Sequence, residues 1–261
     1  MPRKRKTDKS PRLYHELAEW FHLLTAPEDY KEEAEFYRRT IVENSIVPVK
    51  TVLEMGSGGG NNASHMKAHF NLMLTDLSEN MLAISRRINP ECEHIRGDMR
   101  NMQLERQFDA VFVQDAISHL LTINDLSSAI ETAFVHCKPG GVALLAPDYT
   151  RESFKPSTQH GGHDGENRGM RYLEWTWDPD PADTEYIMDF AYLMREKDKV
   201  RCEYDRMAMG LFSKNEWLLL MKNAGFTDVK MKNAGFTDVK KIPYPDNISW
   251  TTPVFIGVRS E

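Results

Sequence analysis

The chain has few cysteines and no long apolar run. Its 261 residues include only 3 cysteines, Cys92, Cys137 and Cys202, which lie far apart in the sequence. An odd, scattered set argues against a disulfide framework and favours free thiols in a reducing compartment, so we expect a cytoplasmic protein. No segment approaches the ~18 consecutive apolar residues of a membrane span, and no apolar signal segment opens the chain. We therefore expect no association with a membrane.

An excess of basic residues is also missing. Lysine and arginine number 33 against 39 aspartates and glutamates, which gives a net charge of -6 at pH 7. A nucleic-acid partner would require a basic face for its phosphates, so the composition argues against one. The short basic run at 3–6 is expected to belong to a disordered, solvated tail over residues 1–12. The length is sufficient for one sizeable core.

The most informative segment is a glycine-rich turn that follows a short apolar run. Residues 52–55 lead into Gly56-Ser57-Gly58-Gly59-Gly60, where the missing side chains let a ligand approach the main chain. A second apolar run ends at Asp76, 20 residues beyond Gly56, an offset at which an acid accepts hydrogen bonds from ribose. Asn61 stands where the dinucleotide fingerprint needs glycine, and no phosphate-loop motif is present. The turn therefore predicts a site for a nucleoside without a pyrophosphate.

Apolar and amphipathic segments alternate over residues 50–147. The pattern predicts strands at 51–55, 71–75, 93–95, 109–113 and 141–146, with helices at 61–69, 79–87 and 124–137. Such alternation is typical of an α/β, Rossmann-like fold: a mostly parallel seven-stranded sheet with helices on both faces. Ligands bind such sheets at the carboxyl ends of the strands, where the strand order reverses.

The segments on either side of this alternation have a different character. Apolar residues at helical spacing over 13–48 predict a lid of two helices, divided at Pro27. Residues 148–170 are polar and predict a long loop, and the following period-two patterns predict strands at 171–177, 185–194 and 200–209. The expected units are the tail over 1–12, the lid over 13–48, a ligand-binding core over 49–147, an inserted antiparallel sheet over 148–212 that forms the substrate region, and a closing helix (213–224) and strand (253–258) within 213–261.

One stretch of ten residues occurs twice. Residues 221–230 recur unchanged as 231–240. The fold needs one copy, in which a helix ends at a cap on Gly225 and a strand follows through Val229. A ten-residue shift rotates a helix by about 280°, so the second copy cannot continue the same apolar face. We interpret it as a duplication that adds a loop or a poorly packed extension and carries no chemistry.

Five motifs in a fixed order resemble the class I S-adenosylmethionine-dependent methyltransferases. They lie at 54–60, 75–82, 97–100, 108–113 and 137–142. The resemblance implies the Rossmann-like fold and S-adenosyl-L-methionine as the cofactor. It also implies that Gly56 and Gly58 pass beneath the methionine part of the cofactor, while Glu54 acts through the turn or through a water molecule.

The same resemblance implies contacts with the adenosine part of the cofactor. Asp76 would take the ribose hydroxyls and Leu77 would pack on the adenine ring. Asp98 would receive the adenine amino group, with Met99 beside the ring. Gln114, at the end of the fourth strand of the core, faces the methyl group in this fold, so Gln114 or the neighbouring Asp115 is expected to touch the cofactor or to cap the next turn.

A narrower resemblance involves the amino-sugar N,N-dimethyltransferases of antibiotic biosynthesis. It is carried by Tyr14, by the segments 29–34, 97–100 and 210–217, and by the closing residues 255–258. Members of that family also insert a small antiparallel sheet after the fifth strand. By this likeness, Tyr14 and Tyr30 would close over the cofactor and the substrate.

Candidates for catalysis come from two places. His119 follows the fourth strand of the core and could act as a base, or could be an ordinary core or helix-surface histidine. The segment 160–165 reads His-Gly-Gly-His-Asp-Gly and could be a lid that brings His163 or Asp164 to the substrate. A metal site and a surface loop without a role are the other interpretations of this segment, but its spacing matches no strong metal motif, so we predict no metal.

The inserted region offers two further features. On a strand, Arg171, Leu173, Trp175 and Trp177 would share one face, where the aromatic rings could form a cation-binding wall or simply pack the sheet. Acidic residues crowd the segment 178–189, which we interpret as a solvated face that would also favour a cationic amine.

We therefore predict a methyltransferase that acts on a small-molecule acceptor, most readily on an amine nitrogen. An amine must lose a proton before it attacks, which a base or carboxylate assists. The alternatives are an O-methyltransferase acting on a hydroxyl or carboxylate with His119 or His163 as the base, and a catalytically silent cofactor-binding partner protein. A nucleic-acid methyltransferase is disfavoured by the acidic charge. A homodimer is left open.

Overall fold

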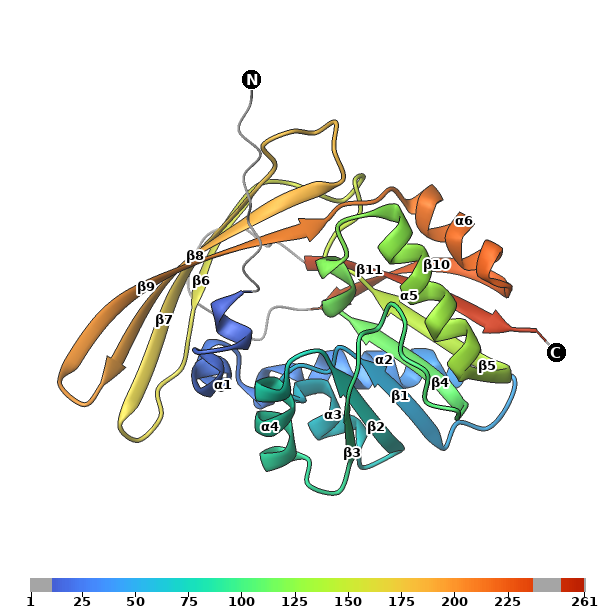
Figure 1. Cartoon of the computed structure of the whole chain (residues 1–261), viewed down its shortest axis with the longest axis horizontal. Helices are drawn as coiled ribbons and strands as arrows, with labels where there is room; N and C mark the ends of the chain where they lie inside the picture. Colours follow the sequence, from blue (N-terminus) through green and yellow to red (C-terminus); the bar gives the residue numbers. More distant parts are fainter. Residues whose placement is uncertain (1–10, 237–249, 261) are drawn as a thin grey trace.

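Two β-sheets lie side by side in the computed structural model, with an N-terminal helical segment between them (Figure 1). The structure describes residues 11–236 and 250–260. Most of the tail expected over 1–12 lies outside the described residues, and the first described element is a short 3-10 helix, η1 (Arg12–Tyr14). In the described part of the chain, no helix is both long enough and apolar enough to cross a membrane.

The larger sheet has seven strands in the order β10-β11-β5-β4-β1-β2-β3. Its strands are β1 (Thr51–Met55), β2 (Asn71–Asp76), β3 (Glu93–Arg96), β4 (Phe108–Gln114), β5 (Cys137–Ala146), β10 (Phe226–Phe236) and β11 (Trp250–Arg259). The first five are parallel, and β11 runs antiparallel to both β5 and β10. The predicted fold class is therefore confirmed. The strand order reverses between β1 and β4, which is where such sheets bind ligands.

Helices cover both faces of this sheet, which explains why its strands read as continuous apolar runs. The apolar sides of α2 (Lys31–Asn44) and α3 (Asn61–Met66) pack on one face, and those of α5 (Ile123–His136) and α6 (Lys214–Ala224) pack on the other. The central strand β4 is buried on both sides as a result. The remaining helix of the core, α4 (Glu79–Ile88), contacts β2 and β3.

Local capping signals place the helices that frame the site. Ser78 accepts a hydrogen bond from the Met81 amide and so starts α4 directly after β2. Ser213 and Glu216 form a reciprocal capping box at the start of α6. That helix ends at Gly225, whose φ of 108° lies in the left-handed region, as the sequence predicts.

The smaller sheet is antiparallel throughout, in the order β6-β7-β8-β9. Its strands are β6 (Ser157–Gly161), β7 (Arg168–Trp177), β8 (Glu185–Glu196) and β9 (Lys199–Gly210). Strand β6 corrects the expected loop over 148–170. Its residues are almost all polar and carry no alternation of apolar side chains, and it lies at the edge of the sheet, where one neighbour is enough to pair the backbone.

The N-terminal segment packs into the corner between the two sheets. In place of one long helix before Pro27, it forms η1, η2 (Ala18–Trp20) and α1 (Phe21–Leu24), and η3 (Pro27–Tyr30) leads into α2. Leu13, Leu17 and Trp20 join an apolar cluster with the inner face of the smaller sheet. The short turns follow this corner, because a straight helix would present its apolar stripe to one surface only.

The expectation for the repeated stretch is wrong for the first part of its second copy. Strand β10 runs through the junction of the two copies, with Lys230 opposite Ile256 and Met231 opposite Phe255. Residues 221–224 of the first copy end α6, whereas the matching residues 231–234 of the second copy lie in β10. The helical argument therefore does not apply. Residues 237–240 lie outside the described part of the chain.

Candidate cofactor and acceptor site

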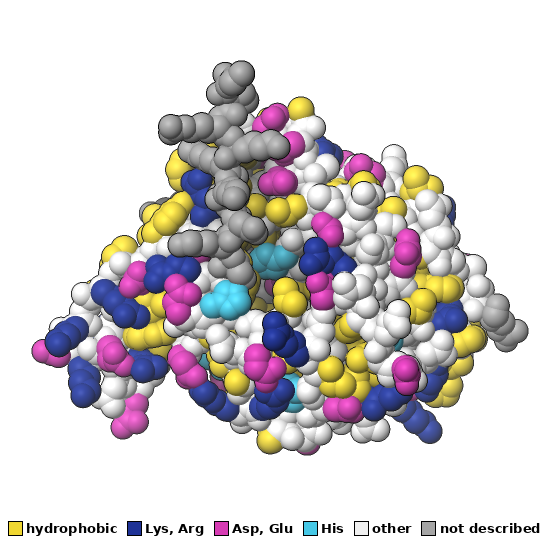
Figure 2. Space-filling model, viewed as in Figure 1, with side chains coloured by type: hydrophobic (Ala, Val, Ile, Leu, Met, Phe, Trp, Pro, Cys, Tyr) yellow, Lys and Arg dark blue, Asp and Glu magenta, His cyan; other side chains and the backbone are white. Residues whose placement is uncertain are grey.

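A single large cavity of about 2680 Å³ opens at the carboxyl ends of β1, β2 and β4 and extends to the inner face of the smaller sheet. Small-molecule pockets are usually about 300–1,000 Å³, so this cavity has room for two ligands. All of the predicted site residues line it: Tyr14, Tyr30, Glu54, Gly56, Gly58, Asp76, Leu77, Asp98, Met99, Gln114, His119 and His163. Figure 2 shows histidine, acidic and basic side chains on the face where the two sheets meet.

The glycine turn brings its backbone against the cavity. Gly56 has a φ of 72°, and a Cβ at this position would lie 2.3 Å from the Cβ of Ala116. The Gly56 amide donates to the Thr75 carbonyl at 2.7 Å, which ties the turn to the end of β2. Gly60 has a φ of 79° and caps α3. Positive φ angles and close packing together require glycine here.

Asp76 is held in a fixed orientation beside this turn. Its Oδ2 accepts from the Gly58 amide at 2.9 Å and its Oδ1 accepts from the Ser78 amide at 2.8 Å. Each oxygen keeps a lone pair for a ligand hydroxyl. Burial raises the pKa of Asp76, and these backbone hydrogen bonds act against that shift. The neighbouring Leu77 has 59% of its side chain exposed, which leaves an apolar surface for a ligand ring.

Asp98 and Met99 form the next part of the wall. Both carboxylate oxygens of Asp98 accept from the Arg100 guanidinium, which also donates to Asp125 at 3.0 Å. The hydrogen bond from Arg100 lowers the pKa of Asp98, so this side chain is charged at neutral pH. The Met99 methyl group lies against Gly56, 2.9 Å from where a Cβ on that glycine would lie.

Several acceptor atoms near the turn lack hydrogen-bond donors. Glu54 is 5% exposed, and burial, followed by the charges of Asp76 and Glu33, raises its pKa to about 8. Within residues 11–236 and 250–260, its Oε2 has no hydrogen-bond partner, and neither do Oγ of Ser57 and Oδ1 of Asn61. Buried acceptors without donors are costly. A ligand that brings an ammonium group and hydroxyl groups would satisfy them, and S-adenosylmethionine has both.

The N-terminal segment contacts the glycine turn directly. A Cβ on Gly59 would lie 2.5 Å from the Phe21 ring, and the His22 Nε2 lies 3.2 Å from the Gly59 carbonyl oxygen. The Ser78 hydroxyl donates to the Tyr14 carbonyl at 2.6 Å. The Tyr30 hydroxyl accepts from the Thr25 hydroxyl at 3.1 Å. The turn is therefore covered on the side that faces the smaller sheet.

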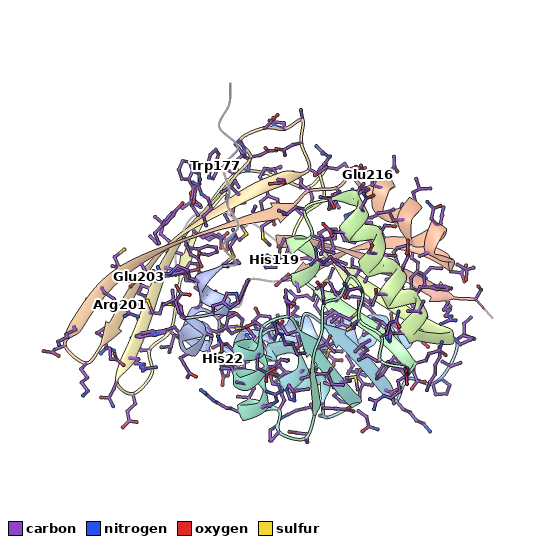
Figure 3. The ribbon with its side chains drawn as sticks, viewed as in Figure 1. His22, His119, Trp177, Arg201, Glu203 and Glu216 are labelled. Atoms are coloured by element: carbon purple, nitrogen blue, oxygen red, sulfur yellow. The ribbon has the colours of Figure 1, made fainter. Side chains whose placement is uncertain are left out.

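Tyr14 and His119 meet in the middle of the cavity. The Tyr14 hydroxyl lies 3.2 Å from the His119 Nε2 and also contacts the Met207 sulfur on β9. Burial lowers the pKa of His119 to about 4, so its imidazole is neutral at pH 7. His119 lies between the core and the smaller sheet in Figure 3. This contact joins the N-terminal segment, the core and the inserted sheet at one point.

His163 and Asp164 point to different partners. The His163 Nε2 lies 2.9 Å from the Asp29 carboxylate of η3, and the His163 amide donates to the Leu23 carbonyl. Asp164 pairs instead with Arg171 and Arg195 of the inserted sheet. In the described ranges, no group of three or more histidine, cysteine, aspartate or glutamate side chains is arranged to hold a metal ion.

Several carboxyl side chains in the cavity wall are not among the predicted site residues, and three of them, Glu33, Asp148 and Glu174, lie near one another. Asp148 follows β5 and interacts through a hydrogen bond with Asp115, which follows β4 and has a φ of 48°. The Tyr186 hydroxyl donates to Asp148 at 3.2 Å. Removal from bulk water, and then the neighbouring negative charge, raises the pKa of Asp115, so the pair holds a proton. The rule that points to Asp76, an acid at a strand end, would also have found Asp148.

Glu33 and Glu174 reach the same region from opposite walls. The Asn62 Nδ2 donates to Glu33 on α2 at 3.1 Å, and removal from bulk water raises the Glu33 pKa to about 7. Glu174 is on the inner face of β7, accepts from the Thr176 hydroxyl at 2.8 Å and has a pKa raised to about 7 by burial. No local pattern predicts either, because their positions depend on which faces of α2 and β7 meet.

The tryptophans of β7 do not form one wall of the cavity. Trp175 is 54% exposed on the outer face of the inserted sheet, where it stacks on Trp177 at 5.6 Å between ring centroids. Trp177 lines the cavity and donates through Nε1 to Asp189 at 2.9 Å. The expected division of faces holds for the exposed Leu173 and Trp175, and the opposite face carries the buried Glu174.

Comparisons with known proteins agree with this geometry. Residues 52–141 match the model of a family described as a methyltransferase domain. The chain is 32% identical over 145 residues to a dTDP-3-amino-3,6-dideoxy-alpha-D-glucopyranose N,N-dimethyltransferase of Streptomyces fradiae, and this match covers 54% of the chain and 56% of the relative. The chain thus spans about half the length of this relative and of a second curated relative that it matches.

Solved structures resemble the chain over nearly its whole length. The sugar N-methyltransferase KedS8 from Streptoalloteichus sp ATCC 53650 has a TM-score of 0.75 at 23% identity, covering 97% of this chain and 95% of that one. CalS10, an amino pentose methyltransferase from Micromonospora echinaspora solved with S-adenosylmethionine bound, has a TM-score of 0.69 at 20% identity, covering 88% and 92%. The chain therefore has the class I S-adenosylmethionine-dependent methyltransferase fold, as its motifs predict.

Proposed function

We propose that this protein transfers the methyl group of S-adenosylmethionine to an amine nitrogen of a small molecule. The observation that carries the proposal is the combination of the bent backbone at Gly56 with the fixed carboxylate of Asp76, beside buried acceptors that lack donors. Relatives named as sugar N-methyltransferases, which share the fold, support an amine as the acceptor.

The bound cofactor supplies a methyl group on a positively charged sulfur, which a nitrogen lone pair displaces in line. The side chains of the protein then have three tasks. The glycine turn and Asp76 orient the adenosine part, and the N-terminal segment excludes water, since positioning alone can contribute about 7–11 kcal/mol of the barrier. Carboxyl groups in the cavity wall accept the proton that an ammonium group must lose. The neutral His119 and the Tyr14 hydroxyl hold the acceptor between the two sheets.

Methyl-labelled cofactor tests this function directly. The protein would be incubated with labelled S-adenosylmethionine and separate sets of amines, hydroxy compounds and carboxylates, and mass spectrometry would locate the label in each product. We expect label on nitrogen. Gly56→Ala, in which the new Cβ would clash with Ala116, is the control and should abolish transfer. Label that appears only on oxygen would contradict an amine acceptor and favour an O-methyltransferase.

A further inference from the structure

We infer that the acceptor is a cationic amine that carries no phosphate group, held by the carboxyl cluster Glu33, Asp115, Asp148 and Glu174. This inference rests on the proposed function and narrows its substrate class. The cluster lies in the cavity wall, between the strand ends of the core and the inner face of the inserted sheet.

The four carboxyl groups come from four separate elements and meet in one space. Asp115 and Asp148 follow adjacent strands of the core and share a hydrogen bond, Glu33 projects from α2, and Glu174 projects from β7. The negative charge of Asp148 helps to raise the pKa of each of the other three carboxyl groups, so all three lie near Asp148. Ionised carboxylates that share one space repel one another, and a cation between them would relieve that repulsion.

A second observation points to a ligand with several N–H donors. Asn62 is 3% exposed and lies in the cavity wall beside Glu33. Its Nδ2 is fully used, because it donates to Glu33 and to Gln114, each at 3.1 Å. Its carbonyl oxygen has no partner among the described residues. An ammonium group has three donors, so it can serve carboxylates and this carbonyl together.

The basic side chains of the cavity are already paired. In its described lining there is no lysine, and each of the four arginines contacts a carboxylate: Arg12 with Glu203 at 2.9 Å, Arg100 with Asp98 at 2.7 Å, Arg171 with Asp164, and Arg206 with Asp189 at 2.6 Å. A diphosphate is usually held by arginine or lysine side chains or by a helix N-terminus. Among the described residues that line the acceptor region, a nucleoside diphosphate would meet acids, and arginines that are already paired with carboxylates. The acceptor is thus expected to differ from the nucleotide-linked sugars in the names of the relatives.

The cluster also provides a route for the proton. The ammonium form of the acceptor gives one proton to an ionised carboxylate of the cluster, which leaves a neutral amine with a free lone pair. That lone pair forms the new C–N bond as the C–S bond breaks, and the electron pair of the broken bond stays on sulfur. Ordinary alkyl amines have pKa values near 10, so a nearby carboxylate is needed at neutral pH.

A paired comparison of acceptors tests the inference. Turnover would be measured with unphosphorylated diamines and free amino sugars, and with the same amino sugars linked to thymidine diphosphate. The complex with S-adenosylhomocysteine would also be titrated with thymidine diphosphate in a calorimeter. We expect at least tenfold higher kcat/KM for the unphosphorylated amines and no heat from thymidine diphosphate. A preference for the nucleotide-linked amines, or measurable binding of thymidine diphosphate, would overturn the inference and leave the proposed function standing. Label only on oxygen, or no turnover of any amine, would overturn both.

A matched pair of variants tests the cluster itself. Glu174→Gln keeps the size of the side chain and its hydrogen bond with Thr176, and removes the charge. We expect KM for the amine to rise at least tenfold while the affinity for S-adenosylhomocysteine stays within twofold. Glu196→Gln, at the far end of the same sheet and paired with Arg168, is the control and should change neither. An unchanged KM in Glu174→Gln would overturn the role of the cluster.

Discussion

The seven-stranded core and the inserted sheet bury their side chains in opposite ways. In the core, residues 110–113 of β4 are fully buried, because helices cover both faces. In the inserted sheet, one face packs on the N-terminal segment and lines the cavity. The other leaves Leu173, Trp175 and Tyr204 51–55% exposed. Ligand groups in the core therefore come from strand ends, whereas in the inserted sheet they come from a strand face.

We call the part of the cavity at the glycine turn the cofactor half and the part at the carboxyl cluster the acceptor half. We expect the two halves to tolerate substitutions to different degrees. The cofactor half depends on backbone angles and close contacts that a single methyl group disrupts. The acceptor half depends on side chains from several elements, which can be changed one at a time. Variants that contrast the halves should therefore lose cofactor binding in one case and only turnover in the other.

The largest effect is expected from Gly56→Ala, which places a Cβ 2.3 Å from that of Ala116 at a φ of 72°. Cofactor affinity should fall at least a hundredfold, as measured by calorimetry. Gly165→Ala is the matched control in the inserted region, where the new Cβ would make an ordinary 3.6 Å contact with Leu23. Equal effects of the two variants would remove the contrast between the halves.

Asp76→Ala should weaken cofactor binding by a factor of ten or more, because it removes the carboxylate held by Gly58 and Ser78. Asp180→Ala, at an exposed position of the inserted region, should leave the affinity unchanged. The measurement is a calorimetric titration with S-adenosylhomocysteine. An unaltered affinity in Asp76→Ala would refute the ribose assignment.

The contact between the two halves should affect turnover and not cofactor affinity. Tyr14→Phe and His119→Asn are each expected to lower kcat about tenfold, and the double variant should lose less than the product of the two, since residues in contact are coupled. The measurement is the steady-state rate of each variant. His69→Asn on the exposed surface is the control. Independent effects of the two variants would argue against a shared role.

A smaller effect is expected from His163→Ala, which removes the pair with Asp29 and so loosens the N-terminal segment from the inserted sheet. Partly exposed ion pairs contribute about 0.2–1 kcal/mol, so turnover should slow only a few-fold while cofactor affinity is retained. Arg168→Ala, which breaks an exposed pair with Glu196, serves as the comparison. An unaltered rate would leave this loop without a catalytic role.

We expect Glu54→Gln to have the smallest effect on cofactor binding. Its effect on the stability of the folded state should depend on pH. Burial raises the Glu54 pKa to about 8 from an ordinary 4.5, so the folded state binds an extra proton between these values. This proton stabilises the folded state fully at acid pH, and the stabilisation is lost as the pH rises through 8. The melting temperature of the variant should therefore exceed that of wild type at pH 9, by roughly 2–4 °C for each kcal/mol of difference in the free energy of unfolding. Near pH 4 the two melting temperatures should be equal. Thermal unfolding at both pH values measures this, and an equal difference at both would contradict the assignment.

The cofactor half was largely predictable because its chemistry is local in the sequence. Gly56, Asp76 and Asp98 follow apolar runs at recognisable intervals, and parallel strands bring their ends together. The polar strand β6 was not predictable, since its pairing with β7 is imposed by the neighbouring strand. The repeated stretch was misjudged because residues 231–236 extend β10 and pair with β11, although residues of the same type end α6 in the first copy.

The sequence by itself determined the parallel core, its order of strands and helices, and the glycine turn that lines the cavity, because each depends on the conformational preferences of a few consecutive residues. Only the tertiary structure decided which acids share the acceptor space. Glu33, Asp148 and Glu174 are separated by more than a hundred residues at the extremes, and they meet because α2, β5 and the inner face of β7 pack around the same cavity. Packing over such distances leaves no period or spacing in the sequence from which the contact could be predicted.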